Sequence, residues 1–428
     1  MSRSASPPDL DSQALSGVFY LSLLGLMFFA LGVTVLIPII PLFITDELGA
    51  SERWIGTATL AVAFTAVMSR IPTGALSDRQ GRRQLMLVGA GLGVVAAGLY
   101  LVSTSVPVFL VARIATGASL AVFTTASKAF AADLAPPRRR GEALGLNNAA
   151  FSLAAVLSPL LSEGLKNAVG FRAVFAFYGV ASVLALAITY TLPRVKPAFS
   201  TSAGAGRDMR DTLSSRGVWA AILLMVGLGA ILALMFTFYP LLADRKQLFE
   251  DAPGVFAAVA MGLGLSIWSL LDTLVEPVAG RISDRIGRQP VAIPGLVLAI
   301  VGAYLLSRAT STFPAYAAIA IMSIGWGSAR AVADTVSQDV IPPVLRGMSA
   351  AILYTSFDLA IGIDAQILST LIDGADFSRL FTTVLLMVGI FGTLGLLLST
   401  RVPVYERPAV PIEEPEPAEP VKVPALHD

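Results

Sequence analysis

Apolar stretches of about twenty residues alternate along the chain with short polar segments that carry arginine, proline or glycine. An α-helix rises about 1.5 Å per residue and needs about twenty residues to cross the hydrocarbon layer of a membrane. Each stretch is therefore predicted to be a membrane-spanning helix. The pattern predicts spans at Gly17–Phe43, Trp54–Leu76, Leu85–Val102, Val106–Ala131, Ala143–Leu165, Ala173–Leu192, Val218–Leu242, Val255–Ala279, Val291–Leu306, Phe313–Val336, Met348–Ile372 and Leu380–Ser399.

The polar segments divide the chain around these spans. We expect a cytoplasmic tail at residues 1–16, a six-helix bundle at 17–192, a linker at 193–216, a second bundle at 217–400 and a tail at 401–428. The last tail is rich in proline and glutamate, cannot bury a core and is expected to be disordered. Arginine and lysine collect in loops on one side of the spans, which places both termini in the cytoplasm. We expect a multi-pass protein of the plasma membrane, which in bacteria is the inner membrane.

Composition agrees with lipid as the main solvent, because 55% of the 428 residues are hydrophobic and only 14% are charged. The net charge of +1 gives no basic face for nucleic acid. The chain has no cysteine, and its only histidine is His427 in the tail. Thiol catalysis and imidazole metal sites are thereby excluded. We expect no enzyme activity, catalytic residue, metal or cofactor, and any proton chemistry must use carboxylates.

The two groups of spans carry the same landmarks in the same order. GALSDRQGRRQ, which starts at Gly74, recurs as GRISDRIGRQP from Gly280, a displacement of 206 positions. The same displacement carries DLAPPRRRG onto DVIPPVLRG and so matches Asp133 to Asp339. Two landmarks in one register indicate a duplicated, pseudo-symmetric pair of halves. Many secondary transporters are built from such repeats, with the substrate site near the middle of the membrane.

The loop that starts at Gly74 resembles the signature loop of the major facilitator superfamily, and the resemblance covers the chain except for its tails. It implies an all-α integral membrane fold of twelve transmembrane helices in two pseudo-symmetric six-helix bundles. The implied partners are a small-molecule substrate, protons and the lipid bilayer, and we expect a monomer that does not bind nucleic acid.

In that family, the Asp and Arg residues of this loop latch the two halves in the outward-facing state. By the resemblance, Asp78 would meet the start of span 11 near Met348, and Arg82 would reach Asp133. The alternative is that these charges only determine topology. The predicted latch comprises Gly74, Asp78, Arg79, Gly81, Arg82, Arg83 and Asp133, with Gly280, Asp284, Arg285, Gly287, Arg288 and Asp339 as its mirror.

Ionisable residues inside the predicted spans form the second set of candidates, since each costs several kcal/mol unless it is paired or faces water. The candidates for proton coupling or substrate binding are Arg113, Lys128, Asp272, Glu276, Arg330, Asp334, Asp358 and Asp364.

Asp272 is the strongest of these candidates for proton coupling, because it lies about 12 Å from the cytoplasmic end of its helix, close to the middle of the membrane. Glu276 is four residues further on, and the repeat maps it onto Arg70, so an ion pair between the halves is an alternative to a proton role. Arg330 and Asp334 are one turn apart and are able to neutralise each other.

Arg113 and Lys128 share span 4. Arg113, in RIATGASLA, resembles the Arg-x-x-x-Gly pattern of proton-coupled family members, with Thr116 in place of the usual glutamine. The alternative for Arg113 is a structural pairing. Lys128 maps onto Asp334, which indicates attraction across the halves, with a snorkelling side chain as the alternative. For Asp358, a packing role in a glycine-rich helix is the alternative.

Together these features favour proton-coupled export of small apolar or amphiphilic compounds by alternating access, through a cavity expected to be poor in charge. Protonation of a mid-membrane acid in the second half would compete with substrate. AAVLSPLLSEG in span 5 lacks the glycines typical of proton antiporters, which weakens this reading. An uptake symporter or facilitator for a sugar or organic anion is the rival, favoured if Arg113, Lys128 and Arg330 converge on one pocket. A transport-inactive membrane sensor is the remaining alternative.

Overall fold

The computed structural model describes residues 15–136, 139–195, 210, 212–342, 346–372 and 376–399, and these are almost entirely helical. The predicted tail at 401–428, most of the tail at 1–16 and most of the linker at 193–216 lie outside the described residues. The N-terminal half contains α1 (Gly17–Thr34), α2 (Ile40–Leu42), the π-helix η1 (Phe43–Glu47), α3 (Arg53–Gln80), α4 (Arg82–Leu101), α5 (Val106–Leu134), α6 (Arg140–Val169) and α7 (Phe171–Thr191).

The C-terminal half repeats this order of long helices. It contains α9 (Arg216–Ala233), the π-helix η3 (Leu234–Phe238), α10 (Tyr239–Arg245), the 3-10 helix η4 (Gly254–Val259), α11 (Ala260–Ile286), α12 (Gln289–Arg308), α13 (Thr312–Asp339), α14 (Arg346–Ser369) and α15 (Ser378–Ser399).

Ten helical segments in the described part of the chain are long and apolar enough to cross a membrane. Their outward faces expose large apolar side chains such as Val95, Val180 and Leu386, as expected for contact with lipid. α3 and α13 are also long, at 28 residues each, but carry charged residues within them, such as Arg70 in α3 and Arg330 in α13. For these two helices, crossing the membrane stays a prediction.

The first long helical segment of each half has an irregular turn beside a proline. α1 ends at Thr34 and the helix resumes at Ile40, because Pro38 and Pro41 have no backbone N–H to continue the ladder. In the second half, Pro240 follows the π-helical segment η3. Both features are local backbone irregularities inside a long apolar segment, which are tolerated where the segment is buried in protein.

The duplication is visible in the packing as well as in the sequence. Gly89 of α4 lies against α5 so closely that a Cβ would be 2.6 Å from the Phe123 nitrogen. Gly295 of α12, 206 positions later, contacts α13 in the same way, with a Cβ placed 3.0 Å from the Ala329 nitrogen. Small residues at such contacts let helix backbones approach in the absence of a hydrophobic driving force.

The helix ends beside the two signature loops also match. Gly81 ends α3 with φ +94°, and Gly287 ends α11 with φ +99°. Glycine adopts this conformation without the steric cost that a Cβ imposes. We call the end of the molecule at Gly81 and Gly287 the basic end, and the opposite end, at Arg53 and Thr312, the distal end.

Aromatic side chains fill the interior of each half. In the N-terminal half, the ring of Phe29 stacks on Phe123 with centroids 3.9 Å apart. In the C-terminal half, the centroids of Trp268 and Trp326 are 5.6 Å apart. All four side chains are buried, so they form core rather than an exposed surface.

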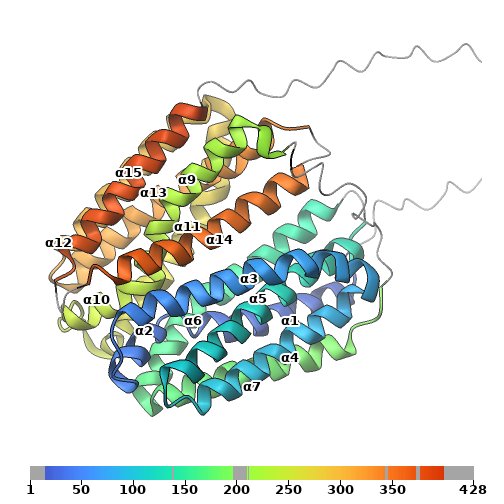
Figure 1. The fold of residues 1–428 in the computed structure, drawn as a ribbon, viewed down its shortest axis with the longest axis horizontal. Coiled ribbons are helices and arrows are strands. Elements are labelled where there is room, and N and C mark those ends of the chain that lie inside the picture. The colour runs from blue at the N-terminus through green and yellow to red at the C-terminus, as the bar shows by residue number, and fades with distance from the viewer. Residues whose placement is uncertain are drawn as a thin grey trace, which may run out of the picture.

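The two halves form two groups of helices, blue to green and yellow-green to red, that approach each other near α2 and α10 (Figure 1). α3 packs on α14 and α6 packs on α11 across the interface. At the distal end, Arg245 forms an ion pair with Glu52 at 2.5 Å, and Thr57 donates a hydrogen bond to Gln366 at 3.0 Å. The halves are therefore fastened to each other at the distal end.

Candidate functional site

Seven charged side chains gather where the two halves face each other, between the distal contacts and the basic end. We call them the central cluster: Arg70, Lys128, Asp272, Glu276, Arg330, Asp334 and Asp358. Arg70 of α3 forms an ion pair with Asp358 of α14, which joins the halves. The Lys128 side chain is exposed and lies within electrostatic range of Arg70, Arg330, Asp334 and Asp358.

Arg330 holds the acids of the C-terminal half together. Its guanidinium pairs with Glu276 of α11 and lies 3.8 Å from Asp334, one turn away on α13. It also lies 5.2 Å from the ring centroid of Trp326, in cation–π range. Tyr354 of α14 donates a hydrogen bond to Asp334 at 3.3 Å. One arginine therefore connects two helices and an aromatic ring.

The alternative in which Glu276 pairs with Arg70 across the halves was wrong. Arg70 pairs with Asp358 and Glu276 pairs with Arg330. The reason is the helix packing: α3 lies against α14, whereas α11 lies against α13 of its own half. The expected neutralisation of Asp334 by Arg330 is present, but Glu276 is the nearer acid.

Among the acids of the central cluster, Asp272 has a buried carboxylate oxygen without a hydrogen-bond partner in the described part of the chain. It lies on α11 one turn before Glu276, and its Oδ1 is buried without a hydrogen-bond partner among the described residues. It faces the backbone of Gly327 on α13, where a Cβ would be 3.1 Å from that oxygen. A buried carboxylate without a partner costs several kcal/mol while it is charged, and protonation removes that cost.

Arg113 and Asp364 lie apart from the central cluster. Arg113 donates from Nε to the Ala58 carbonyl oxygen at 3.2 Å. It is fifteen residues from Lys128 on α5, about 22 Å along the helix. Asp364 is buried in the C-terminal half, where its Oδ2 faces Gly229 and has no partner in the part of the chain described. Arg113, Lys128 and Arg330 therefore do not converge on one pocket.

The expectation of a cavity poor in charge was also wrong for the region between the halves at the central cluster. Three cationic and four acidic side chains meet between the halves. Sequence analysis identified these residues one at a time, whereas packing brings helices from both halves to one place. Across the described residues, no group of three or more His, Cys, Asp or Glu is placed to hold a metal ion.

The ion pairs expected of the latch are present in both halves. Arg82 Nε lies 3.2 Å from Asp133 Oδ2, and Arg82 Nη1 donates to Ser77 at 2.7 Å. The mirror residue Arg288 lies 2.8 Å from Asp339 and donates to Ser283 at 2.8 Å. Each pair joins helices of a single half, and a role in latching the halves remains a prediction.

The other latch residues have varied surroundings. Asp284 pairs with Arg288 at 2.5 Å. Arg83 donates to the carbonyl oxygens of Thr189, at 3.3 Å, and of Tyr190, at the end of α7. Arg285 is exposed, and a Cβ at Gly280 would meet no atom within 4 Å. The side chains of Asp78 and Arg79, the surroundings of Gly74 and the expected contact of Asp78 near Met348 lie outside what the structure describes.

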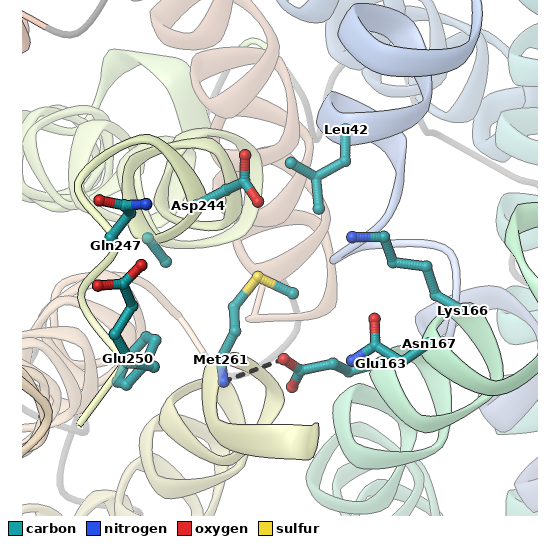
Figure 2. Close-up of a pocket in the computed structure, with 10 residues that line it drawn as sticks. Leu42, Glu163, Lys166, Asn167, Asp244, Gln247, Glu250 and Met261 are labelled. Atoms are coloured by element: carbon teal, nitrogen blue, oxygen red, sulfur yellow. Dashed lines mark hydrogen bonds between the residues drawn. The ribbon is translucent and has the colours of Figure 1, made fainter. Parts of the chain in front are cut away.

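Sequence reasoning missed one buried acid, Glu163 of α6. Its carboxylate crosses the interface and accepts hydrogen bonds from the backbone nitrogens of Gly262, at 2.6 Å, and Met261, at 3.3 Å. It lines a pocket of about 350 Å³ at the distal end, together with Lys166 and residues of the C-terminal half (Figure 2). The available signal was its position inside a predicted span, residues 143–165.

Comparison with known proteins agrees with this architecture. The sequence profile of the Major Facilitator Superfamily matches residues 22–268 and 255–426. An uncharacterised MFS-type transporter of Methanocaldococcus jannaschii is 24% identical over 341 residues, which cover 78% of this chain and 86% of that protein. Multidrug resistance protein MdtG of Dickeya zeae is 26% identical over 296 residues, which cover 66% of this chain and 70% of that protein.

Solved structures share the fold at low sequence identity. A bacterial homologue of the human lysosomal transporter Spinster, in an inward-facing and unoccupied conformation, superposes with a TM-score of 0.77 at 15% identity, covering 92% of this chain and 98% of that one. A D-xylose–proton symporter gives a TM-score of 0.72 at 19% identity, covering 90% and 98%. With a profile that matches nearly the whole chain, the duplicated helical halves and the apolar spans, this chain belongs to the major facilitator superfamily of multi-pass membrane transporters.

Proposed function

We propose that the protein exports small apolar or amphiphilic compounds in exchange for protons, by alternating access. The basic end and both termini are cytoplasmic, because arginines concentrate in the loops at that end. The distal end then faces outward and is closed in this conformation, as an inward-facing state requires. The similarity to proteins named for multidrug resistance supports the direction of export and the substrate class.

The proton-coupling proposal rests on the surroundings of Asp272. The residue is half-buried, its Oδ1 is buried without a hydrogen-bond partner among the described residues, and it lies within electrostatic range of Arg330 and Glu276. A proton on Asp272 removes the cost of the buried charge and changes the balance of charge around Arg330. Binding of a proton and binding of a cationic or amphiphilic substrate therefore compete for the same acidic surroundings.

The central cluster also gives the rival function one argument. Arg70, Lys128 and Arg330 supply three cationic groups to which an organic anion or a sugar could bind. The four acids offset them, and Arg70 and Arg330 are already engaged in ion pairs. The excess of acid over base favours an amphiphilic cation over an anion, so export remains the first proposal and uptake of a polar solute the second.

Measurement of flux in proteoliposomes with an imposed pH gradient distinguishes export from uptake. We expect an amphiphilic dye to move against the protons, and Asp272→Asn to abolish the dependence of this flux on the gradient. Asp46→Asn, an exposed acid at the distal end, is the matched control and should behave as wild type. Solute that moves with the protons would support uptake, and an absence of flux for dyes, sugars and organic anions alike would support a sensor.

A further inference from the structure

The backbones of α6 and α11 lie very close along the distal part of the interface. Ser266 donates a hydrogen bond to the Val156 carbonyl oxygen at 2.7 Å. A Cβ at Gly262 would overlap the carbonyl oxygen of Pro159. This contact between the halves has no room for a larger residue, and so α6 reaches the first turn of α11 directly.

Glu163 caps that first turn from the opposite half. The backbone N–H groups of Met261 and Gly262 lie in the first turn of α11, where helices leave N–H groups without a partner inside the helix. Val259, which precedes the helix, provides no side-chain cap. A carboxylate is favoured at this position by both hydrogen bonds and the positive end of the helix dipole. The cap exists only while the halves are together.

The Glu163 carboxylate lies beside a pocket at the distal end of the interface. The pocket that Glu163 lines has a volume of about 350 Å³, which is room for roughly ten water molecules. Figure 2 shows Glu163 and Lys166 of α6 on one side of the pocket, and Asp244 and Glu250 of the other half on the opposite side. Tyr239 and Tyr316 also lie within electrostatic range of Glu163. The charge of Lys166 favours the ionised form of Glu163.

We propose that Glu163 is a proton-binding site that controls the distal gate: the charged carboxylate holds α11 and keeps the halves closed, and the protonated form releases them. Protonation removes the negative charge that the two N–H groups and the helix dipole stabilise, so both charge-assisted hydrogen bonds weaken. The proposal rests on the proposed outward orientation of the distal end. It does not depend on Asp272 or on the identity of the substrate.

Distances between spin labels across the gate provide the test. The chain has no native cysteine, so Val169→Cys and Phe256→Cys, both exposed at the distal ends of the two halves, give a clean pair of labels. In lipid nanodiscs without substrate, we expect acidification to shift wild type toward longer distances. Glu163→Gln should raise the ratio of open to closed at neutral pH about tenfold, equivalent to about 1.4 kcal/mol, and should remove most of the pH response.

Glu250→Gln is the matched control, since Glu250 lines the same pocket but does not cap α11, and it should retain the pH response. Glu163→Asp, which keeps the charge, should retain the response and confirms that the site tolerates substitution. A Glu163→Gln protein whose distance distribution and pH response match wild type would overturn the proposal. The Asp272→Asn variant with the same two labels should still show longer distances across the gate at acidic pH, even if its flux no longer depends on the proton gradient. The result distinguishes failure of the gate proposal from failure of the proton-coupling proposal.

Discussion

Glu52 and Arg245 form the ion pair that joins the two halves outside the spans. Partial burial raises the pKa of Glu52, but the hydrogen bond and the charge from Arg245 lower it, so that the pKa falls below its ordinary value of 4.5. The contribution of Glu52 to the closed state is therefore fully present above pH 4.5 and is lost only as the pH falls through the lowered pKa. Mild acidity leaves this pair intact.

The lowered pKa of Glu52 leads to a prediction about Arg245→Gln. Loss of the ion pair should make the distal end open more often, by a factor of a few, because a partly exposed pair contributes about 0.2–1 kcal/mol. The pH response between neutral and mildly acidic conditions should keep its shape, since Glu52 stays ionised there. Spin-label distances across the gate measure both quantities. A pH response that disappears in Arg245→Gln would show that the wrong acid has been assigned to the gate.

Among helices, the contact of α4 with α5 predicts opposite effects of the same substitution at two glycines. Gly89→Ala should destabilise the protein by about 1–3 kcal/mol, because the new Cβ would lie 2.6 Å from the Phe123 nitrogen, a backbone atom that cannot move aside. Gly98→Ala, on the same helix with no atom within 4 Å, should be neutral or stabilise by up to about 1 kcal/mol. Unfolding in detergent, followed by circular dichroism, compares the two. Equal effects would contradict the close packing.

Helix positions were largely predictable from the sequence, because lipid requires long apolar segments. α1 begins at Gly17 and α5 at Val106, as predicted. The ends beside the signature loops were predicted too early: α3 continues to Gln80 rather than Leu76, and α11 to Ile286 rather than Ala279. The prediction ended each helix where charged residues mark the edge of the membrane. The helix itself continues past that edge and ends at a glycine with positive φ.

Side-chain partners between the halves were less predictable. The repeat identifies equivalent positions, such as Arg70 and Glu276, but equivalence is not contact. Which residues meet depends on the rotation of each helix and on which pairs pack, and one sequence specifies neither directly. Glu163 illustrates the limit, since its partners are backbone nitrogens about a hundred residues away that have no signature in the sequence.

On the scale of the whole molecule, the duplicated signature loops lie at one end and the contacts that close the two halves lie at the other. Arg82 with Asp133 and Arg288 with Asp339 repeat the same geometry 206 positions apart, and both pairs lie at the basic end of the molecule. The cross-half contacts of Glu52 and Thr57 lie at the other side. Alternating access then requires the distal contacts to break while the basic end closes.

Labelling of single cysteines with a membrane-impermeant maleimide tests this arrangement. The cysteine-free chain allows exposed positions to be compared directly: Gln80 and Ile286 beside the two signature loops, and Ser51 and Phe313 at the distal end. In intact cells we expect Ser51→Cys and Phe313→Cys to react, and Gln80→Cys and Ile286→Cys to react only after permeabilisation. Reaction of Gln80→Cys and Ile286→Cys from opposite faces would break the duplicated architecture, because parallel halves related by an axis along the membrane normal place equivalent loops on one face.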